Sequence, residues 1–140
     1  MKSSEIEETL QKIVKRNPRY HRDAYLFVQE GLDFTLKKFE KPNRKPGHIS
    51  GQELLEGIRE LAIEQFGPMA RTVFTEWGIF SCEDFGEIVF ILVEHELLSK
   101  NERDSREDFK DGYDFFETFE KPYLPTAKLA ARQKPAVMKG

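Results

Sequence analysis

The stretch that decides the fold reads SGQELLEGIRELAIEQFGP and spans residues 50–68. Ser50 stands three residues before Glu53, the spacing of a capping box, in which each side chain accepts a hydrogen bond from the other residue's backbone N–H at a helix start. Apolar side chains then recur every three or four residues, the period of one helix face: Leu54, Leu55, Ile58, Leu61, Ala62 and Phe66. Gly67 can adopt the left-handed conformation that ends a helix, and Pro68 can begin the next one. The sequence therefore predicts an amphipathic helix that leads directly into another.

Two helices are predicted after this junction, over residues 68–77 and 82–98. Gly78 ends the first, and Ser81 with Asp84 repeats the capping-box spacing at the start of the second. The second is the most apolar helix of the chain, so we expect it to be central.

Two more helices are predicted upstream of residue 50. The first begins at Ser4 and Glu7, which again have the capping-box spacing, and it ends before Pro18. The second covers residues 23–39, and the prolines, glycine and charges of residues 41–47 indicate a loop.

Residues 97–116 are interpreted as a β-hairpin with a long polar loop. Two features compete with this interpretation. Ser105 and Asp108 have the spacing that caps a short helix, and Asp111-Gly112 favours a tight turn later in the segment. Prolines then predict an extended basic tail over residues 121–140.

Three helices followed by a hairpin, with the last helix the most buried, resemble a winged-helix domain. The segment VEHELLSK (residues 93–100) resembles the exit from a recognition helix into the first strand of the wing, and Gly78 resembles the glycine of the helix-turn-helix turn. This resemblance covers about half the chain. It implies a mainly α fold with a small β-hairpin (α+β), in which a winged-helix-like core over residues 50–116 is preceded by two helices over residues 1–40.

A second resemblance is to a family of short uncharacterised bacterial proteins, largely restricted to the Verrucomicrobia and Planctomycetes. The segments that carry it are ISGQELLEGIRELA (49–62), EQFGP (64–68), EDFGEIVF (83–90) and DSREDF (104–109). It extends over roughly residues 20–120 and implies a cytosolic protein with a single domain, over residues 1–120. It implies no activity.

The composition is that of a folded domain, because 39% of the 140 residues are hydrophobic and 34% are charged. A single cysteine, Cys82, allows no internal disulfide. The longest uninterrupted apolar run, residues 88–93, is too short to cross a bilayer, and the first residues show no apolar leader. We therefore expect a cytoplasmic protein with no membrane partner.

Charge is segregated along the chain, although the net charge is only −3. Residues 1–50 carry +4, residues 51–120 carry −12, and residues 121–140 carry +5. Such a pattern fits basic ends that lie against an acidic body, and it also fits ends that bind nucleic acid or an acidic partner. The candidate residues for binding nucleic acid or an acidic partner are Lys128, Arg132, Lys134 and Lys139.

The helix over residues 82–98 carries a candidate protein-binding face. It contains no Lys or Arg, which argues against insertion into a DNA groove, because phosphate contacts need cations. Two apolar residues flank a stripe of acidic residues at helical spacing, and the face consists of Glu83, Glu87, Phe90, Ile91 and Glu94. We expect Phe90 and Ile91 to be covered by the N-terminal helices, by a basic and apolar partner, or by a second copy of the chain.

No motif in the sequence indicates a catalytic, metal-binding or phosphate-binding site. His21, His48 and His95 are far apart and fit no zinc or di-iron pattern, and no phosphate-binding loop or nucleophile elbow is present. Cys82 begins a helix beside two acids, so we expect an inert thiol. We expect no catalytic residue, cofactor, metal or small-molecule substrate.

The sequence therefore predicts a non-enzymatic cytosolic adaptor or regulator that acts through protein contacts, with another protein or as a homodimer. The alternative is a nucleic-acid-associated regulator or a ribosome-associated factor. That alternative would use the basic N-terminal region and the tail.

Overall fold

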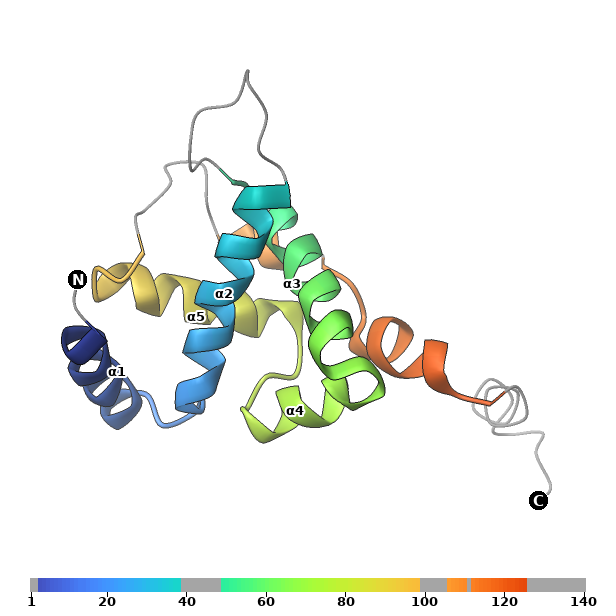
Figure 1. Ribbon diagram of the computed structural model, residues 1–140, viewed down its shortest axis with the longest axis horizontal. Coiled ribbons are helices and arrows are strands. Elements are labelled where there is room, and N and C mark those ends of the chain that lie inside the picture. Colours follow the sequence, from blue (N-terminus) through green and yellow to red (C-terminus); the bar gives the residue numbers. More distant parts are fainter. Residues whose placement is uncertain (1–2, 39–48, 99–105, 111, 126–140) are drawn as a thin grey trace.

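The computed structural model describes residues 3–38, 49–98, 106–110 and 112–125. The α-helices are α1 (Ser3–Arg16), α2 (Arg22–Lys38), α3 (Gly51–Phe66), α4 (Ala70–Glu76) and α5 (Cys82–Glu94). The shorter helical segments are η1 (Gly67–Met69), η2 (Arg106–Phe109), the π-helix η3 (Phe116–Glu120) and η4 (Lys121–Tyr123). In Figure 1, α2 lies beside α3, α5 crosses α2, α1 packs at one end, and η3 lies at the other end.

The start of α3 confirms the predicted capping box. The Glu53 backbone N–H donates to Ser50 Oγ at 3.1 Å, and the Ser50 N–H donates to Glu53 Oε1 at 3.1 Å. At the other end of α3, Gly67 has a positive φ of 51°, and the 3-10 helix η1 begins there with Pro68 in its first turn. The close junction between the two predicted helices is therefore confirmed.

Helices α2 and α3 form the most extensive helix–helix contact among the described residues. Small residues make this contact possible: a Cβ added to Gly57 would overlap Thr35 Oγ1, and one added to Gly31 would lie 2.9 Å from Ile58 Cγ1. Thr35 is fully buried, and its hydroxyl donates to the Gly31 carbonyl at 2.6 Å. The buried hydroxyl therefore has a hydrogen-bond partner. An ion pair between Lys38 and Glu60 links the same two helices at the surface.

Phe74 of α4 is the centre of an aromatic core. Its side chain is completely buried. Its ring centroid lies 5.3–6.2 Å from those of six rings on α2, α3, the end of α4, α5 and the C-terminal segment: Phe27, Phe66, Trp77, Phe85, Phe115 and Phe119. One side chain thus connects most of the elements.

The predicted α+β fold class is wrong. The described part of the chain contains helices and no β-strand, so the predicted hairpin over residues 97–116 does not form there. Residues 106–109 form η2 instead, while residues 99–105 and 111 lie outside the described residues. This removes the wing from the predicted winged-helix-like core over residues 50–116.

Long-range packing explains why residues 106–109 and 115–120 are helical. The Phe109 ring lies over two glycines, since a Cβ on Gly86 would be 2.8 Å from it and one on Gly51 would be 3.1 Å away. Phe115 and Phe119 are four residues apart and their ring centroids lie 5.2 Å from each other, which is helical spacing rather than strand alternation. Asp114 Oδ2 also accepts the Glu117 N–H at 3.0 Å, as a residue at a helix start does.

Helix α5 ends earlier than predicted, at Glu94 rather than at residue 98. Glu96 adopts a positive φ of 61°, and the Leu97 N–H turns back to the Leu92 carbonyl at 2.9 Å. The predicted tail begins with the 3-10 turn η4, and residues 126–140 lie outside the described residues. No described helix has the length and apolar character needed to cross a membrane.

Candidate functional site

The structure brings the predicted protein-binding residues to one face of α5. Glu83 and Glu94 are exposed, and Glu87, Phe90 and Ile91 are partly exposed. The opposite face of the helix enters the core through Phe85, Ile88 and Leu92, none of which has accessible surface. We call the first set, Glu83, Glu87, Phe90, Ile91 and Glu94, the outer face of α5.

The N-terminal helices cover part of α5. Helix α2 packs against it, and Phe90 and Ile91 both pack against the hydrophobic core. Each of these two side chains keeps some accessible surface. The outer face is therefore an acidic surface with two partly exposed apolar side chains beside the acids.

A buried carboxylate at the start of α5 joins three segments of the chain. Asp84 is 4% exposed, and its Oδ1 accepts hydrogen bonds from the Tyr20 hydroxyl at 2.6 Å and from an Arg19 guanidinium nitrogen at 2.7 Å. Its Oδ2 accepts the backbone N–H groups of Phe80 at 2.8 Å and Ser81 at 3.2 Å. The N-terminus of a helix also favours a negative charge. The α1–α2 linker, the α4–α5 loop and the first turn of α5 are thus held together by one side chain.

The same linker and loop also touch through their backbones. Gly78 has φ 84°, and a Cβ there would overlap the Arg19 carbonyl oxygen. The His21 N–H donates to the Trp77 carbonyl at 3.1 Å. Gly78 is therefore required for the close approach of these two segments as well as for the turn.

The phenol of Tyr20 stays protonated and donates to Asp84. Burial, and after it the hydrogen bond to Asp84, raises the pKa of Tyr20 above its ordinary value.

Asp84 holds two strongly exposed side chains next to the outer face. Phe80 is 55% exposed although its backbone N–H is bonded to Asp84. The Arg19 side chain is 64% exposed, and its guanidinium carbon lies 5.2 Å from the centroid of the Tyr20 ring. Sequence reasoning did not find these residues. An available signal was Phe80 itself, a large apolar residue between a helix-ending glycine and a helix cap.

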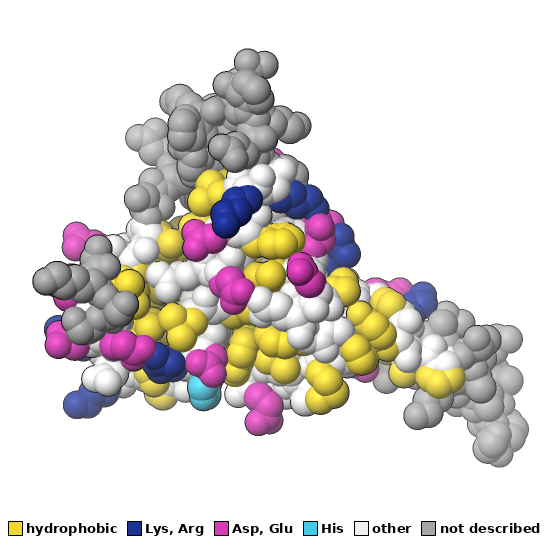
Figure 2. All heavy atoms as spheres, in the orientation of Figure 1, with side chains coloured by type: hydrophobic (Ala, Val, Ile, Leu, Met, Phe, Trp, Pro, Cys, Tyr) yellow, Lys and Arg dark blue, Asp and Glu magenta, His cyan; other side chains and the backbone are white. Residues whose placement is uncertain are grey.

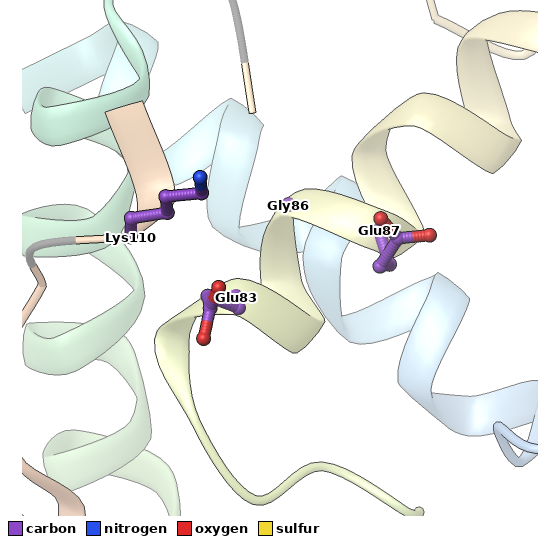
Figure 3. Close-up of a pocket in the computed structure, with 4 residues that line it drawn as sticks. All are labelled: Glu83, Gly86, Glu87 and Lys110. Atoms are coloured by element: carbon purple, nitrogen blue, oxygen red, sulfur yellow. The ribbon is translucent and has the colours of Figure 1, made fainter. Parts of the chain in front are cut away.

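A small pocket lies beside the outer face, between α5 and the residue that follows η2. Glu83, Gly86, Glu87 and Lys110 line it, and its volume is about 200 Å³. Figure 3 shows both carboxylates on α5 and the Lys110 side chain on the neighbouring segment. Small-molecule sites usually have about 300–1,000 Å³ and mostly apolar walls. This pocket is smaller than that range, and three of its four lining residues are charged.

Cys82 lies under the C-terminal segment and is 3% exposed. Its Sγ is 3.5 Å from the Tyr113 carbonyl oxygen, and burial raises the pKa of the thiol to about 12. The thiol is therefore protonated at neutral pH, and a protonated thiol is a poor nucleophile.

Within the described ranges, no group of three or more His, Cys, Asp or Glu side chains is placed to hold a metal ion. His48 lies outside those ranges. The tail residues proposed to bind nucleic acid or an acidic partner lie outside them too: Lys128, Arg132, Lys134 and Lys139.

Comparison with known proteins finds no family model, no curated protein and no solved structure that matches the chain.

Proposed function

We propose that this protein is a small non-enzymatic adaptor or regulator that binds a partner protein through the outer face of α5 and the adjoining Phe80. The observation that supports this most is the position of Phe80. Its ring is 55% exposed, whereas its backbone is tied to a carboxylate that is only 4% exposed.

An exposed aromatic residue on a fixed loop is well suited to binding. A side chain that is already positioned loses little further freedom when a partner buries it. Aromatic and arginine side chains supply much of the binding energy at protein interfaces. The same carboxylate binds the Arg19 guanidinium and the Phe80 backbone N–H, so the Arg19 side chain and the Phe80 backbone are held before any partner arrives.

The outer face of α5 specifies the chemistry of the partner. Glu83 and Glu94 are exposed acids at the two ends of the face, and Phe90 and Ile91 add partly exposed apolar surface between them. Protein interfaces commonly combine an apolar centre with a polar rim. A partner that fits this face carries both basic and apolar side chains.

A second candidate function is binding to nucleic acid through the N-terminal region. Lys12, Lys15 and Arg16 are exposed on α1, on the side of the helix away from the buried Leu10 and Ile13. A row of cations on an exposed helix attracts phosphates without sequence preference. This candidate concerns a different helix from the first, so the two can be tested separately.

Crosslinking of the full chain in an extract of its source cells tests the first candidate, with captured proteins identified by mass spectrometry. The double variant Glu83→Lys/Glu94→Lys reverses the charge at both ends of the face and is expected to lose the partner. The matched control Glu8→Lys/Glu64→Lys changes the net charge equally at exposed positions on α1 and α3 and is expected to keep it. Equal capture by both double variants contradicts the proposal, as does a wild-type chain that captures no partner.

Retention on immobilised mixed RNA and DNA tests the second candidate. If the wild-type chain is retained at low salt, and Lys12→Gln/Lys15→Gln/Arg16→Gln abolishes retention, the nucleic-acid function replaces the first one. Retention must also fall steeply as salt is added, because binding to phosphates releases counterions.

A further inference from the structure

We propose that the surface around Phe80 is self-complementary, and that two copies of the chain associate through it about a two-fold axis. The inference rests on the proposed function for the location of the binding surface, and it names a second copy of the chain as one partner. It is carried by exposed side chains of opposite charge on the two segments that Asp84 joins, together with the exposed Phe80.

The basic side of this surface is the end of α1. Lys15 and Arg16 are exposed in its last turn, and Arg19 follows three residues later with a side chain that is 64% exposed. Figure 2 shows Lys and Arg side chains next to Asp and Glu side chains at the end of the molecule where α1 lies.

The acidic side is the start of α5. Glu83 is exposed and directly precedes Asp84, the residue that binds Arg19. The two sides therefore meet at Asp84. Phe80 lies at this boundary, because its own backbone N–H is bonded to the same carboxylate.

A two-fold contact uses both sides at once. In such a contact, if a residue of one protomer faces a given residue of its partner, the same two residues also face each other with the protomers exchanged. An axis that passes beside Phe80 brings the two Phe80 rings together and places the basic end of each α1 against Glu83 of the other protomer. A partner of one charge would match only half of this surface, whereas a second copy matches both halves.

Sedimentation velocity of the full chain over a wide range of protein concentrations tests the proposal. We expect a monomer–dimer equilibrium in which Phe80→Ala raises the dissociation constant by about tenfold or more, as truncation of a central aromatic side chain does. Met69→Ala is the matched control, because Met69 is also 55% exposed but belongs to η1. It is expected to leave the dissociation constant unchanged.

Charge reversal tests the pairing of the two sides. Glu83→Arg places like charges together and is expected to weaken dimerisation, while Glu64→Arg makes the same change of net charge on α3 and is expected to have no effect. Adding Lys15→Glu and Arg16→Glu to Glu83→Arg reverses both sides and is expected to restore the dimer. Circular dichroism confirms that each variant remains folded.

A chain that stays monomeric at every concentration overturns the proposal, and so does a Met69→Ala variant that weakens the dimer as much as Phe80→Ala does. These results are separate from the crosslinking experiment. A monomeric chain that still captures another protein through α5 overturns self-association alone. A dimer that captures no other protein overturns the adaptor function alone.

Discussion

Asp84 shows how much of the local structure depends on a single residue. It accepts four hydrogen bonds from the α1–α2 linker and the α4–α5 loop, one of them from a guanidinium group. A buried acceptor with all its partners stabilises the fold, and losing one acceptor leaves buried donors without a partner. The position of Phe80 and Arg19 at the surface therefore depends on this one carboxylate.

We expect Asp84→Asn to lower the free energy of unfolding by about 2–3 kcal/mol. The new amide group has one acceptor oxygen, so its NH₂ must face either Tyr20 and Arg19 or the N–H groups of Phe80 and Ser81. Urea denaturation measures the effect. Glu83→Gln is the control at the exposed neighbouring position, where a change within about 0.5 kcal/mol is expected. Equal losses in the two variants would show that Asp84 does not join the segments.

Two buried groups that ionise in alkali, the Cys82 thiol and the Tyr25 phenol, predict how the free energy of unfolding changes at high pH. Burial raises the pKa of Cys82 to about 12 from an ordinary value of 9.0, and that of Tyr25 to about 12 from 10.0. The Tyr25 hydroxyl is also buried without a hydrogen-bond partner among the described residues. Both groups are neutral when protonated, so the unfolded chain loses these protons at a lower pH than the folded chain does.

The free energy of unfolding is therefore expected to fall as the pH rises from about 9 to about 12. Each group contributes a slope of at most about 1.4 kcal/mol per pH unit. Denaturation curves at a series of pH values measure this slope. In Cys82→Ser the hydroxyl does not ionise in this range, so the fall between pH 9 and 10 is expected to be shallower. An unchanged slope would contradict the assignment to Cys82.

At the level of elements, the starts of α3 and α5 were predictable because a capping box depends on a few neighbouring residues. The end of α5 was not, since Glu96 takes a left-handed conformation with no glycine to signal it. The helical character of residues 106–109 and 115–120 was missed for a different reason. It depends on Phe109 fitting over Gly51 and Gly86, and these contacts join residues far apart in the sequence.

The contact between α2 and α3 leads to a prediction of its own. Alanine normally stabilises a helix relative to glycine by about 1 kcal/mol. We nevertheless expect Gly57→Ala to destabilise the protein by about 1–3 kcal/mol, because the new methyl group overlaps Thr35 Oγ1. Chemical denaturation measures the change. Thr35→Ala added to Gly57→Ala is expected to recover part of the loss, and a Gly57→Ala variant as stable as the wild type would contradict the close contact.

At the level of the whole molecule, helical periodicity was enough to predict that Glu83, Glu87, Phe90, Ile91 and Glu94 share a face. It did not predict that Arg19 and Phe80 lie beside this face. Arg19 and Asp84 are 65 residues apart, and nothing local in either segment indicates their ion pair. The sequence shows charge segregated along the chain, whereas the fold decides which charged segments become neighbours.

The aromatic core predicts that the described elements unfold together. Phe74 is completely buried and contacts rings from α2, α3, α5 and the C-terminal segment. We expect Phe74→Ala to lower the free energy of unfolding by about 3–5 kcal/mol, a large share of the stability of a typical domain. Phe80→Ala removes an exposed ring and is the control, with an expected loss below about 1 kcal/mol at concentrations where the chain is monomeric.

Two signals report on this unfolding transition. Trp77 has its ring centroid 6.1 Å from that of Phe74, so its fluorescence follows the aromatic core, while circular dichroism follows all the helices. If the core joins the elements into one cooperative unit, the two curves shift together to lower denaturant concentration in Phe74→Ala. A fluorescence transition that moves while the helical signal stays in place would show that the helices do not depend on this core.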